Sequence, residues 1–328
     1  MGAGLFSANL VDLRRLNARQ LEPLLAEEVG AWRDELDWDF TRSADLVRRF
    51  VDVHSLNGAA ILEDGAAAGY AYFVLDGNKG LIGDLYVLRD RRSVEIENVL
   101  LERALFEISA HPEIERVESQ LMLVQWPPGR PAPGPARIRT FDRNFMRVEL
   151  GGAKLEQGRV RAVCYIERWS DQYLELAAHA IAEAYTGHLD GAINDQYRGA
   201  AGARKFLHSI VQYPGCGSFA AQASFVAFEP DGLSLCGLSL ASTVAPACGH
   251  ITQICVSPRA RGKALGYELL RRSLVALRDM GCRAATLTVT SANHEAVRLY
   301  ERVGFYTARV FPALVWDELH SPRDGPAV

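Results

Sequence analysis

Apolar and polar positions follow two alternating periods in the C-terminal half of the chain. Residues 251–256, which are mostly apolar, have the length of a buried strand. Leucines then recur at steps of four, one, four and three over 265–277, which predicts a helix with one face packed on a sheet. Residues 283–290 alternate with threonine on one side, as in a strand with a polar face. Helical spacing returns after Asn293, which is placed to cap the helix, and Gly304 is placed to end it.

The N-terminal half is predicted to contain a similar series of elements. Apolar patterning predicts strands near 10–13, 81–87 and 117–123, helices over 17–34, 43–53 and 93–109, and a hairpin of 59–63 with 69–75 around Asp64-Gly65. The proline-rich run 126–135 cannot be helical, because each proline removes a hydrogen-bond donor and restricts the residue before it. A strand over 138–150 follows, and Gly151-Gly152 begins a predicted linker.

The second half repeats this order, which indicates an internal duplication. We expect helices over 170–185 and 200–211 and a hairpin of 224–228 with 235–241. Superimposing Val87 on Val256 without gaps places Arg92 on Arg261 and Leu100-Leu101 on Leu269-Leu270, a period near 169. The length of 328 residues also suggests two domains. We predict domains at residues 1–155 and 156–328.

Composition narrows the class of protein. The net charge of −4 gives no basic footprint for nucleic acid. The first thirty residues lack a charged segment followed by an apolar run, and no stretch reaches the length of a membrane span, so we expect a cytoplasmic protein with no membrane partner. The six cysteines include no Cys-x-x-Cys pair, which indicates neither a disulfide framework nor a metal site.

The turn after the 251–256 strand carries candidate phosphate chemistry. A strand that leads through a small-residue turn into a helix leaves unpaired N–H groups at the positive end of the helix dipole, where an anion binds. Gly262, Ala264 and Gly266 carry little or no side chain, so a pyrophosphate can reach the backbone, and Arg261 and Lys263 add positive charge. The spacing disfavours both a P-loop and a Rossmann fingerprint.

This turn and the helix after Asn293 together resemble the GNAT superfamily of acetyl-coenzyme-A-dependent N-acyltransferases. The family's first motif, Gln/Arg-x-x-Gly-x-Gly/Ala, falls on Arg261, Ala264 and Gly266 after Val256-x-Pro258. The second falls on Asn293-x-x-Ala296-x-x-Leu299-Tyr300-Glu301-x-x-Gly304-Phe305. Ala264 replaces the usual middle glycine, a change that a helical backbone would tolerate.

The resemblance covers the second half well and the first half in outline, and it implies the tandem form of the family. The implied fold is α/β (α+β), with two tandem GNAT-like domains. Each would be a mixed, mostly antiparallel sheet flanked by helices and splayed between its fourth and fifth strands, where coenzyme A inserts.

The resemblance also implies the residues that bind the acyl donor, acetyl-coenzyme A. A bulge in the central strand would let a backbone N–H at Val256 bind the thioester carbonyl. Tyr300 would protonate the departing thiolate as general acid, since it lies two helical turns from Asn293 on the same face. The expected coenzyme-binding residues are Ile254, Cys255, Val256, Arg261, Gly262, Lys263, Ala264, Leu265, Gly266, Tyr267, Asn293 and Tyr300. The alternative for Tyr300 is core packing.

The general base and the acceptor site are less defined by the sequence. Thr288 stands where some relatives carry a catalytic glutamate, and a hydroxyl cannot act as that base. His250 is one candidate, since histidine titrates near neutrality; a structural histidine and a water chain are the alternatives. The acceptor amine should approach the polar run 185–197, which is either a binding segment or a solvated loop. Its candidate residues are His188, Asp190, Asn194 and Tyr197.

The expected function is transfer of an acetyl or other short acyl group from coenzyme A to the amine of a small molecule or peptide, by direct attack in a ternary complex. The alternative is an acyl-coenzyme-A-binding sensor or scaffold without catalysis. The first domain should bind no coenzyme A, because Glu95 and Glu97 fall at the positions of Ala264 and Gly266. The oligomeric state stays open, with a homodimer as one option.

Overall fold

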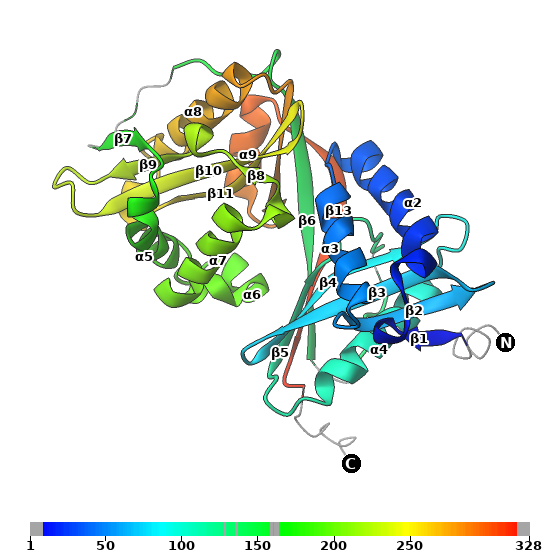
Figure 1. Ribbon diagram of the computed structural model, residues 1–328. Helices are drawn as coiled ribbons and strands as arrows, with labels where there is room; N and C mark the ends of the chain where they lie inside the picture. Colours follow the sequence, from blue (N-terminus) through cyan, green and yellow to red (C-terminus); the bar gives the residue numbers. More distant parts are fainter. Residues whose placement is uncertain (1–8, 128, 135–136, 158–159, 161–163, 320–328) are drawn as a thin grey trace. The chain divides into compact units, whose positions relative to one another are not determined.

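The chain forms two compact units in a computed structural model that describes residues 9–127, 129–134, 137–157, 160 and 164–319 (Figure 1). The first unit comprises Met1–Leu36, Phe40–Asp142 and Val310–Val328. The second comprises Asp37–Asp39 and Arg143–Arg309. Each is a mixed, mostly antiparallel sheet with helices packed on it, as the sequence predicted.

The first unit orders its strands β1-β2-β3-β4-β5-β13. The pairs β1–β2, β2–β3, β3–β4 and β5–β13 are antiparallel, and β4 and β5 are parallel. The Asp64-Gly65 turn of the predicted hairpin has positive φ at both residues, 50° and 84°. The elements are β1 (Leu10–Asp12), the 3-10 helix η1 (Leu13–Arg15), α2 (Ala18–Leu36), α3 (Thr41–Asp52), β2 (Asn57–Glu63), β3 (Ala66–Asp76), β4 (Lys79–Val87), α4 (Val94–Ser109), β5 (Arg116–Gln120) and β13 (Tyr306–Asp317).

The second unit orders its strands β6-β12-β11-β10-β9-β7, and β8 pairs with β10. Here β11 and β12 form the parallel pair. The elements are β6 (Arg137–Glu149), β7 (Tyr165–Arg168), α5 (Leu174–Ala184), α6 (Asp190–Ile193), α7 (Ala200–Gln212), β8 (Ser218–Phe219), β9 (Phe225–Phe228), β10 (Leu235–Ala245), β11 (Cys248–Val256), α8 (Leu265–Asp279), β12 (Ala284–Thr290), α9 (His294–Val303) and the 3-10 helices η2 (Asp171–Tyr173), η3 (Asp195–Arg198), η4 (Pro214–Cys216), η5 (Ala221–Ala223) and η6 (Pro258–Ala260).

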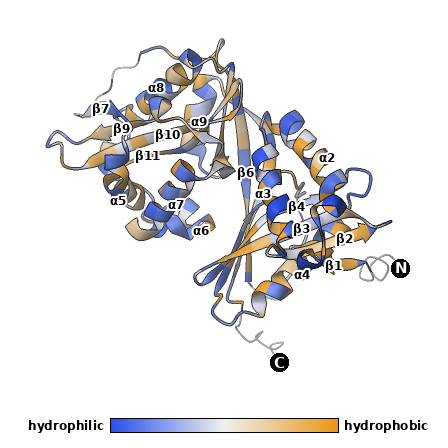
Figure 2. Ribbon diagram, viewed as in Figure 1, coloured by the Kyte–Doolittle hydropathy of each residue, from blue (hydrophilic) through white to orange (hydrophobic). Residues whose placement is uncertain are grey.

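Burial follows the apolar periodicity of the sequence. The five leucines of α8 that recur at helical steps are all fully buried. Apolar residues dominate the central strands of both units, whereas the helices are apolar on one side and polar on the other (Figure 2). No described helix combines the length and apolar character that a membrane crossing requires.

The two units share a detailed register, which supports the internal duplication. In β11, Thr252 is an extra residue that bulges between the partners of Leu240 and Ala241. In β4, Gly83 bulges in the same way between the partners of Tyr72 and Phe73, 169 positions earlier. Parallel pairing is likewise confined to 79–82 in β4 and to 248–251 in β11. After these residues each strand continues without its parallel neighbour.

The final strands are exchanged between the two halves of the sequence. In the second unit, residues 143–149 of β6 pair with all seven residues of β12. In the first unit, residues 313–317 of β13 pair with β5. The units therefore differ from the predicted domains at 1–155 and 156–328, because each sheet takes its last strand from the other half. The strand β13 has no counterpart in the sequence-based prediction.

Candidate active site

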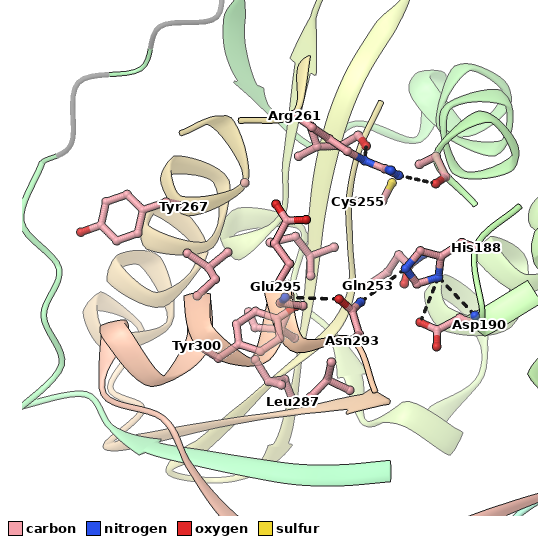
Figure 3. Close-up of a pocket in the computed structure, with 18 of the residues that line it drawn as sticks. His188, Asp190, Gln253, Cys255, Arg261, Tyr267, Leu287, Asn293, Glu295 and Tyr300 are labelled. Atoms are coloured by element: carbon pink, nitrogen blue, oxygen red, sulfur yellow. Dashed lines mark hydrogen bonds and ion pairs between the residues drawn. The ribbon is translucent and has the colours of Figure 1, made fainter. Parts of the chain in front are cut away.

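A cavity of about 700 Å³ opens in the second unit where β11 and β12 separate (Figure 3). Fourteen of the predicted site residues line it: Ile254, Cys255, Val256, Arg261, Gly262, Ala264, Leu265, Gly266, Tyr267, Asn293, Tyr300, His188, Asp190 and Tyr197. Among the described residues, the lining does not include the predicted Lys263, Asn194 or His250. The cavity therefore joins the phosphate turn to the predicted acceptor segment.

The phosphate turn has a different backbone from the one expected. Helix α8 begins at Leu265, and Ala264 before it is left-handed, with φ 64° and ψ 9°. The expectation that Ala264 is helical is wrong, because the chain must reverse here between η6 and α8. Ala264 makes no side-chain capping bond to the first N–H groups of the helix, and the residues that carry these groups, Leu265 and Gly266, line the cavity. A Cβ on Gly266 would come no closer than 3.5 Å to another atom, so the glycine is not required by packing.

Arg261 ties this turn to the neighbouring elements. Its Nε donates to the carbonyl of Val256 at 3.3 Å, and its Nη2 donates to the carbonyl of Ala184 at 2.6 Å (Figure 3). The guanidinium thereby links the end of β11 to the end of α5. In the first unit, Arg92 makes the matching bond to Val87 at 3.4 Å. Arg261 therefore shapes the turn as well as lining the cavity.

The backbone of β11 presents donors to the cavity. The N–H of Ser257 donates to the carbonyl of Cys236 on β10 at 2.9 Å. Because successive N–H groups of a strand point in opposite directions, those of Val256 and Ile254 point away from β10, toward the gap left by β12. The predicted bulge lies in the same strand, at Thr252.

Tyr300 and Asn293 line the cavity from α9 (Figure 3). Burial raises the pKa of the Tyr300 hydroxyl, and the negative charge of Asp190 adds to this shift. The hydroxyl therefore keeps its proton at neutral pH. Asn293 caps the helix as predicted, since its Oδ1 accepts from the N–H of Ala296 at 3.2 Å. Its Nδ2 lies 3.4 Å from Nε2 of His188.

Tyr267 and Cys255 both line the cavity, and burial raises the pKa of each group. The Tyr267 hydroxyl donates to the carbonyl of Glu156 at 2.6 Å. Burial raises the pKa of the Cys255 thiol to about 12, so at neutral pH it is not a thiolate. Within the described part of the chain, no group of three or more His, Cys, Asp or Glu side chains is placed to hold a metal ion.

His250 is a buried residue outside the cavity. Its Nδ1 is 2.8 Å from the hydroxyl of Thr286, and its ring lies edge-on to Trp38 and parallel to Phe145. Burial lowers its pKa to about 3, so the imidazole stays neutral. Trp38 and Phe145 precede the predicted linker, so the pattern of the second half alone could not indicate that they surround His250. The structure thus gives His250 the structural role that was the alternative to catalysis.

The predicted acceptor segment is folded against the cavity. Tyr185 and Tyr197 stack with ring centroids 4.4 Å apart, and His188 lies edge-on to Tyr185. Nδ1 of His188 accepts from the N–H of Asp190 at 3.2 Å, which uses the lone pair that a general base would need on this nitrogen. Asn194 instead caps η3, accepting from the N–H of Gln196.

Arg143, Gln253 and Tyr185 line the cavity but were missed in the sequence. Arg143 lies on β6 and is 9% exposed; its Nη1 donates to Thr290 at 3.0 Å and lies 3.6 Å from Asp190 Oδ1. The hydroxyl of Thr290 donates in turn to Asp190. The row of threonines on β12 could have indicated a polar partner such as Arg143, since buried hydroxyl groups require hydrogen-bond partners.

Comparisons with known proteins agree with this geometry. Residues 159–305 match the model of the Acetyltransferase (GNAT) family. A 60-residue segment is 38% identical to mycothiol acetyltransferase of Rhodococcus jostii, covering 18% of this chain and 20% of that protein. Another, of 61 residues, is 34% identical to an Arabidopsis thaliana N-alpha-acetyltransferase and covers 19% of this chain and 32% of the relative. The matched segments thus span a third or less of these two relatives.

Two solved structures share the fold along nearly the whole chain. A GCN5-related N-acetyltransferase from Sphaerobacter thermophilus superimposes with a TM-score of 0.66 at 15% identity, covering 98% of this chain and 99% of that one. A tandem GNAT protein from the clavulanic acid biosynthesis pathway gives 0.57 at 18% identity, covering 96% and 99%. Residues 159–305 therefore form a domain of the GNAT acetyltransferase family, and the chain shares its fold with that tandem GNAT structure over nearly its whole length.

Proposed function

We propose that the second unit transfers an acetyl or other short acyl group from coenzyme A to a primary amine of a small molecule or peptide. The observation that carries this proposal is the uncapped N-terminus of α8, which opens beside Gly266 onto the gap between β11 and β12. This arrangement suits a pyrophosphate at the helix end and a pantetheine arm along β11. The approach of phosphate oxygens is a reason for glycine at 266, which packing does not require.

The reaction is direct attack of the amine on the thioester carbon. A C–N bond forms, the C–S bond breaks, the nitrogen loses a proton, and the thiolate gains one. The N–H groups of Ile254 and Val256 are oriented to stabilise the oxyanion. Tyr300, which keeps its proton at neutral pH, supplies the thiolate's proton as general acid. The protonated, buried thiol of Cys255 is unsuited to forming an acyl-enzyme.

Asp190 is the proposed anchor for the acceptor's ammonium group. Asp190 lines the cavity and is 9% exposed, and Tyr300, whose pKa is raised in part by the charge of Asp190, also lines it. Nδ1 of His188 is occupied by the N–H of Asp190, and His250 is buried outside the cavity. Water in the cavity is therefore the proposed route by which the ammonium loses its proton.

The first unit is proposed to bind no coenzyme A. At the position equivalent to Gly266, the buried Glu97 binds Nη1 of Arg130 at 2.5 Å, and that guanidinium lies 4.0 Å from the ring of Trp126. Ser93 caps α4 by accepting from Ile96 N–H. The anion position of this unit is thus closed by the protein's own groups. Among the described residues of the 126–135 run, no helix equivalent to α9 forms.

Titration calorimetry with a non-hydrolysable acetyl-coenzyme A analogue tests these assignments together. We expect one site per chain and loss of binding in Gly266→Glu. Two like charges about 4 Å apart cost roughly 4 kcal/mol at an effective dielectric of 20, and a pyrophosphate adds several such pairs. Gly266→Ala separates size from charge, since its Cβ has space in the protein and adds no charge; it should weaken binding much less than Gly266→Glu. An unchanged affinity in Gly266→Glu contradicts the site, and a stoichiometry of two contradicts the closed first unit.

Thiol release with a panel of amines tests catalysis. We expect release of free coenzyme A only when an accepted amine is present, with an acetylated product detected by mass. Binding of the analogue without release for any amine would instead favour a sensor or scaffold.

A further inference from the structure

We propose that the acceptor is an amino acid, in which a carboxylate stands beside the amine that is acylated. This inference rests on the proposed acyl transfer and names the substrate class for the same site. Its basis is a buried pair of hydrogen-bond donors, Nε of Arg143 and Nε2 of Gln253, that have no partner among the residues the structure describes.

Arg143 carries more donor capacity than its surroundings use. Its Nη1 and Nη2 donate to the hydroxyls of Thr290 and Thr288, at 3.0 and 3.3 Å, and Nη1 lies 3.6 Å from Asp190. Its Nε is buried without a hydrogen-bond partner among the described residues. The guanidinium thus has two hydroxyl partners and one ion pair at 3.6 Å, which leaves part of its donor capacity unused. Its planar fork of donors suits a second carboxylate.

Gln253 lines the same cavity and carries a second donor without a partner among the described residues. The residue is 5% exposed and follows the bulge at Thr252, which re-aims the side chains of β11. Its Oε1 accepts from the Tyr185 hydroxyl at 3.4 Å, whereas its Nε2 is buried with no partner among the described residues. A buried donor without an acceptor costs about 1–3 kcal/mol, which an oxygen of the ligand would offset.

The charges of the site match those of a zwitterion. Arg143 and Asp190 present a positive and a negative group 3.6 Å apart at one end of the cavity. An amino acid carries its ammonium and carboxylate at a similar separation. Asp190 then receives the ammonium, and Arg143 with Gln253 receives the carboxylate. A simple amine fills only half of this arrangement and leaves both donors unpaired.

Matched acceptors test this inference in the full chain with acetyl-coenzyme A. Each set holds an amino acid, its amide and its decarboxylated amine. Examples are phenylalanine with phenylalaninamide and phenethylamine, and tyrosine with tyrosinamide and tyramine. Thiol release gives kcat/KM, and mass identifies the acylated nitrogen. We expect the best amino acid to exceed both its amide and its amine at least tenfold.

Two variants assign that preference to the donors. Gln253→Met removes the free amide at similar volume, and Arg143→Lys keeps the charge but loses the fork. We expect the ratio of kcat/KM between amino acid and amine to fall several-fold in each variant, with the Kd of the acetyl-coenzyme A analogue unchanged. Arg298→Met is the control, because Arg298 is exposed and outside the cavity lining. If Arg143→Lys fails to fold, Gln253→Met alone decides the role of the donors.

The outcomes separate this inference from the proposed function. Amines or amides that react as well as their amino acids overturn the zwitterion and leave acyl transfer intact. An amino acid preference that survives both variants also overturns the assignment to Arg143 and Gln253. No thiol release with any acceptor, although the analogue binds, overturns acyl transfer and this inference with it.

Discussion

Ala264 occupies a backbone conformation that suits glycine better. The left-handed conformation costs a residue with a Cβ about 1–2 kcal/mol of folding free energy. Glycine avoids this cost but loses about 0.5–1 kcal/mol through its greater freedom in the unfolded chain. Alanine at this position therefore places strain at the turn that faces the proposed phosphate site.

Replacing Ala264 by glycine should stabilise the protein by about 0.5–1 kcal/mol, measured as a shift of the denaturant midpoint at constant m-value. Ala276→Gly, within the regular part of the same helix, should instead destabilise it by about 1 kcal/mol. A loss of stability in both variants would contradict the strain assigned to Ala264.

Tyr300 has the protonation state that a general acid requires. Because burial raises its pKa, the hydroxyl stays protonated across the neutral range and can donate to a thiolate. Tyr300→Phe should lower kcat by roughly 10²–10⁴-fold with little change in the Kd of coenzyme A. Tyr267→Phe is the comparison, since that hydroxyl bonds to the carbonyl of Glu156 and should affect kcat little. Equal turnover for wild type and Tyr300→Phe would return Tyr300 to a packing role.

The residues that the sequence predicted for this site are mostly contiguous in the chain. Arg261 to Tyr267 and Asn293 to Tyr300 are joined by one helix and one strand, so local patterning brings them together. Arg143 reaches the site through the antiparallel register of β6 with β12, which pairs it with Thr290. That register depends on pairing between strands far apart in the sequence, so the local pattern of residues could not predict that Arg143 lies in the site.

At the scale of elements, the first unit buries two carboxyl groups, Asp84 of β4 and Glu28 of α2. Asp84 is the counterpart of Gln253 on β11. Asp84 lies 169 positions before Gln253 and directly after the equivalent bulge. It is 5% exposed, and its charge acts on Glu28 of α2, which has no exposed surface. The Tyr70 hydroxyl also donates to Glu28, at 2.9 Å. Burial raises the pKa of both carboxyls, and the charge of Asp84 adds to the shift of Glu28.

This pair should make the stability of the protein fall as pH rises. A carboxyl with a raised pKa in the folded state binds more protons there than in the unfolded chain. Its contribution is present below the unfolded pKa of about 4 and is lost as pH rises through the folded value. The slope is about 1.4 kcal/mol per pH unit for each proton.

Glu28→Gln should remove part of this dependence, because the amide is neutral at every pH and can donate to Asp84 while accepting from Tyr70. We expect the variant to gain stability over wild type as pH rises from 4 to 8, measured by urea unfolding. Glu22→Gln, on the solvent-exposed side of the same helix, should show no such trend. Parallel stability curves for wild type and Glu28→Gln would contradict the raised pKa.

Most elements could be predicted because their faces are set by local composition. The leucine stripe of α8, the Asn293 cap and the Gly304 end of α9 are examples, and Gly304 has the expected positive φ of 112°. Residues 306–317 were not predicted as a strand. The exposed Tyr306 and Val310 break the alternation of a half-buried strand, and β13 is defined by its pairing with β5.

At the scale of the whole molecule, the exchanged strands mean that a cut near residue 155 removes an edge from each sheet. A fragment of residues 156–309 would leave the seven residues of β12 without β6. Each ladder hydrogen bond contributes about 0.5–1.5 kcal/mol net, and an open apolar edge favours aggregation.

We therefore expect residues 137–309 to unfold cooperatively and residues 156–309 to aggregate or to melt without a transition, as followed by circular dichroism and light scattering. Both fragments lack Asp37–Asp39 equally, so their difference reports β6 together with the segment 150–155 that follows it. Equal melting curves would show that β6 is dispensable for the second unit.

The same exchange sets an order for folding during synthesis. The ribosome makes β5 nearly two hundred residues before its partner segment in β13, residues 313–317. At about 5–20 residues per second, the edge of β5 stays unpaired for roughly 10–40 s. The half that is made first is thus completed last, and throughout that interval a chaperone, or β5 of another nascent chain, has access to the open edge.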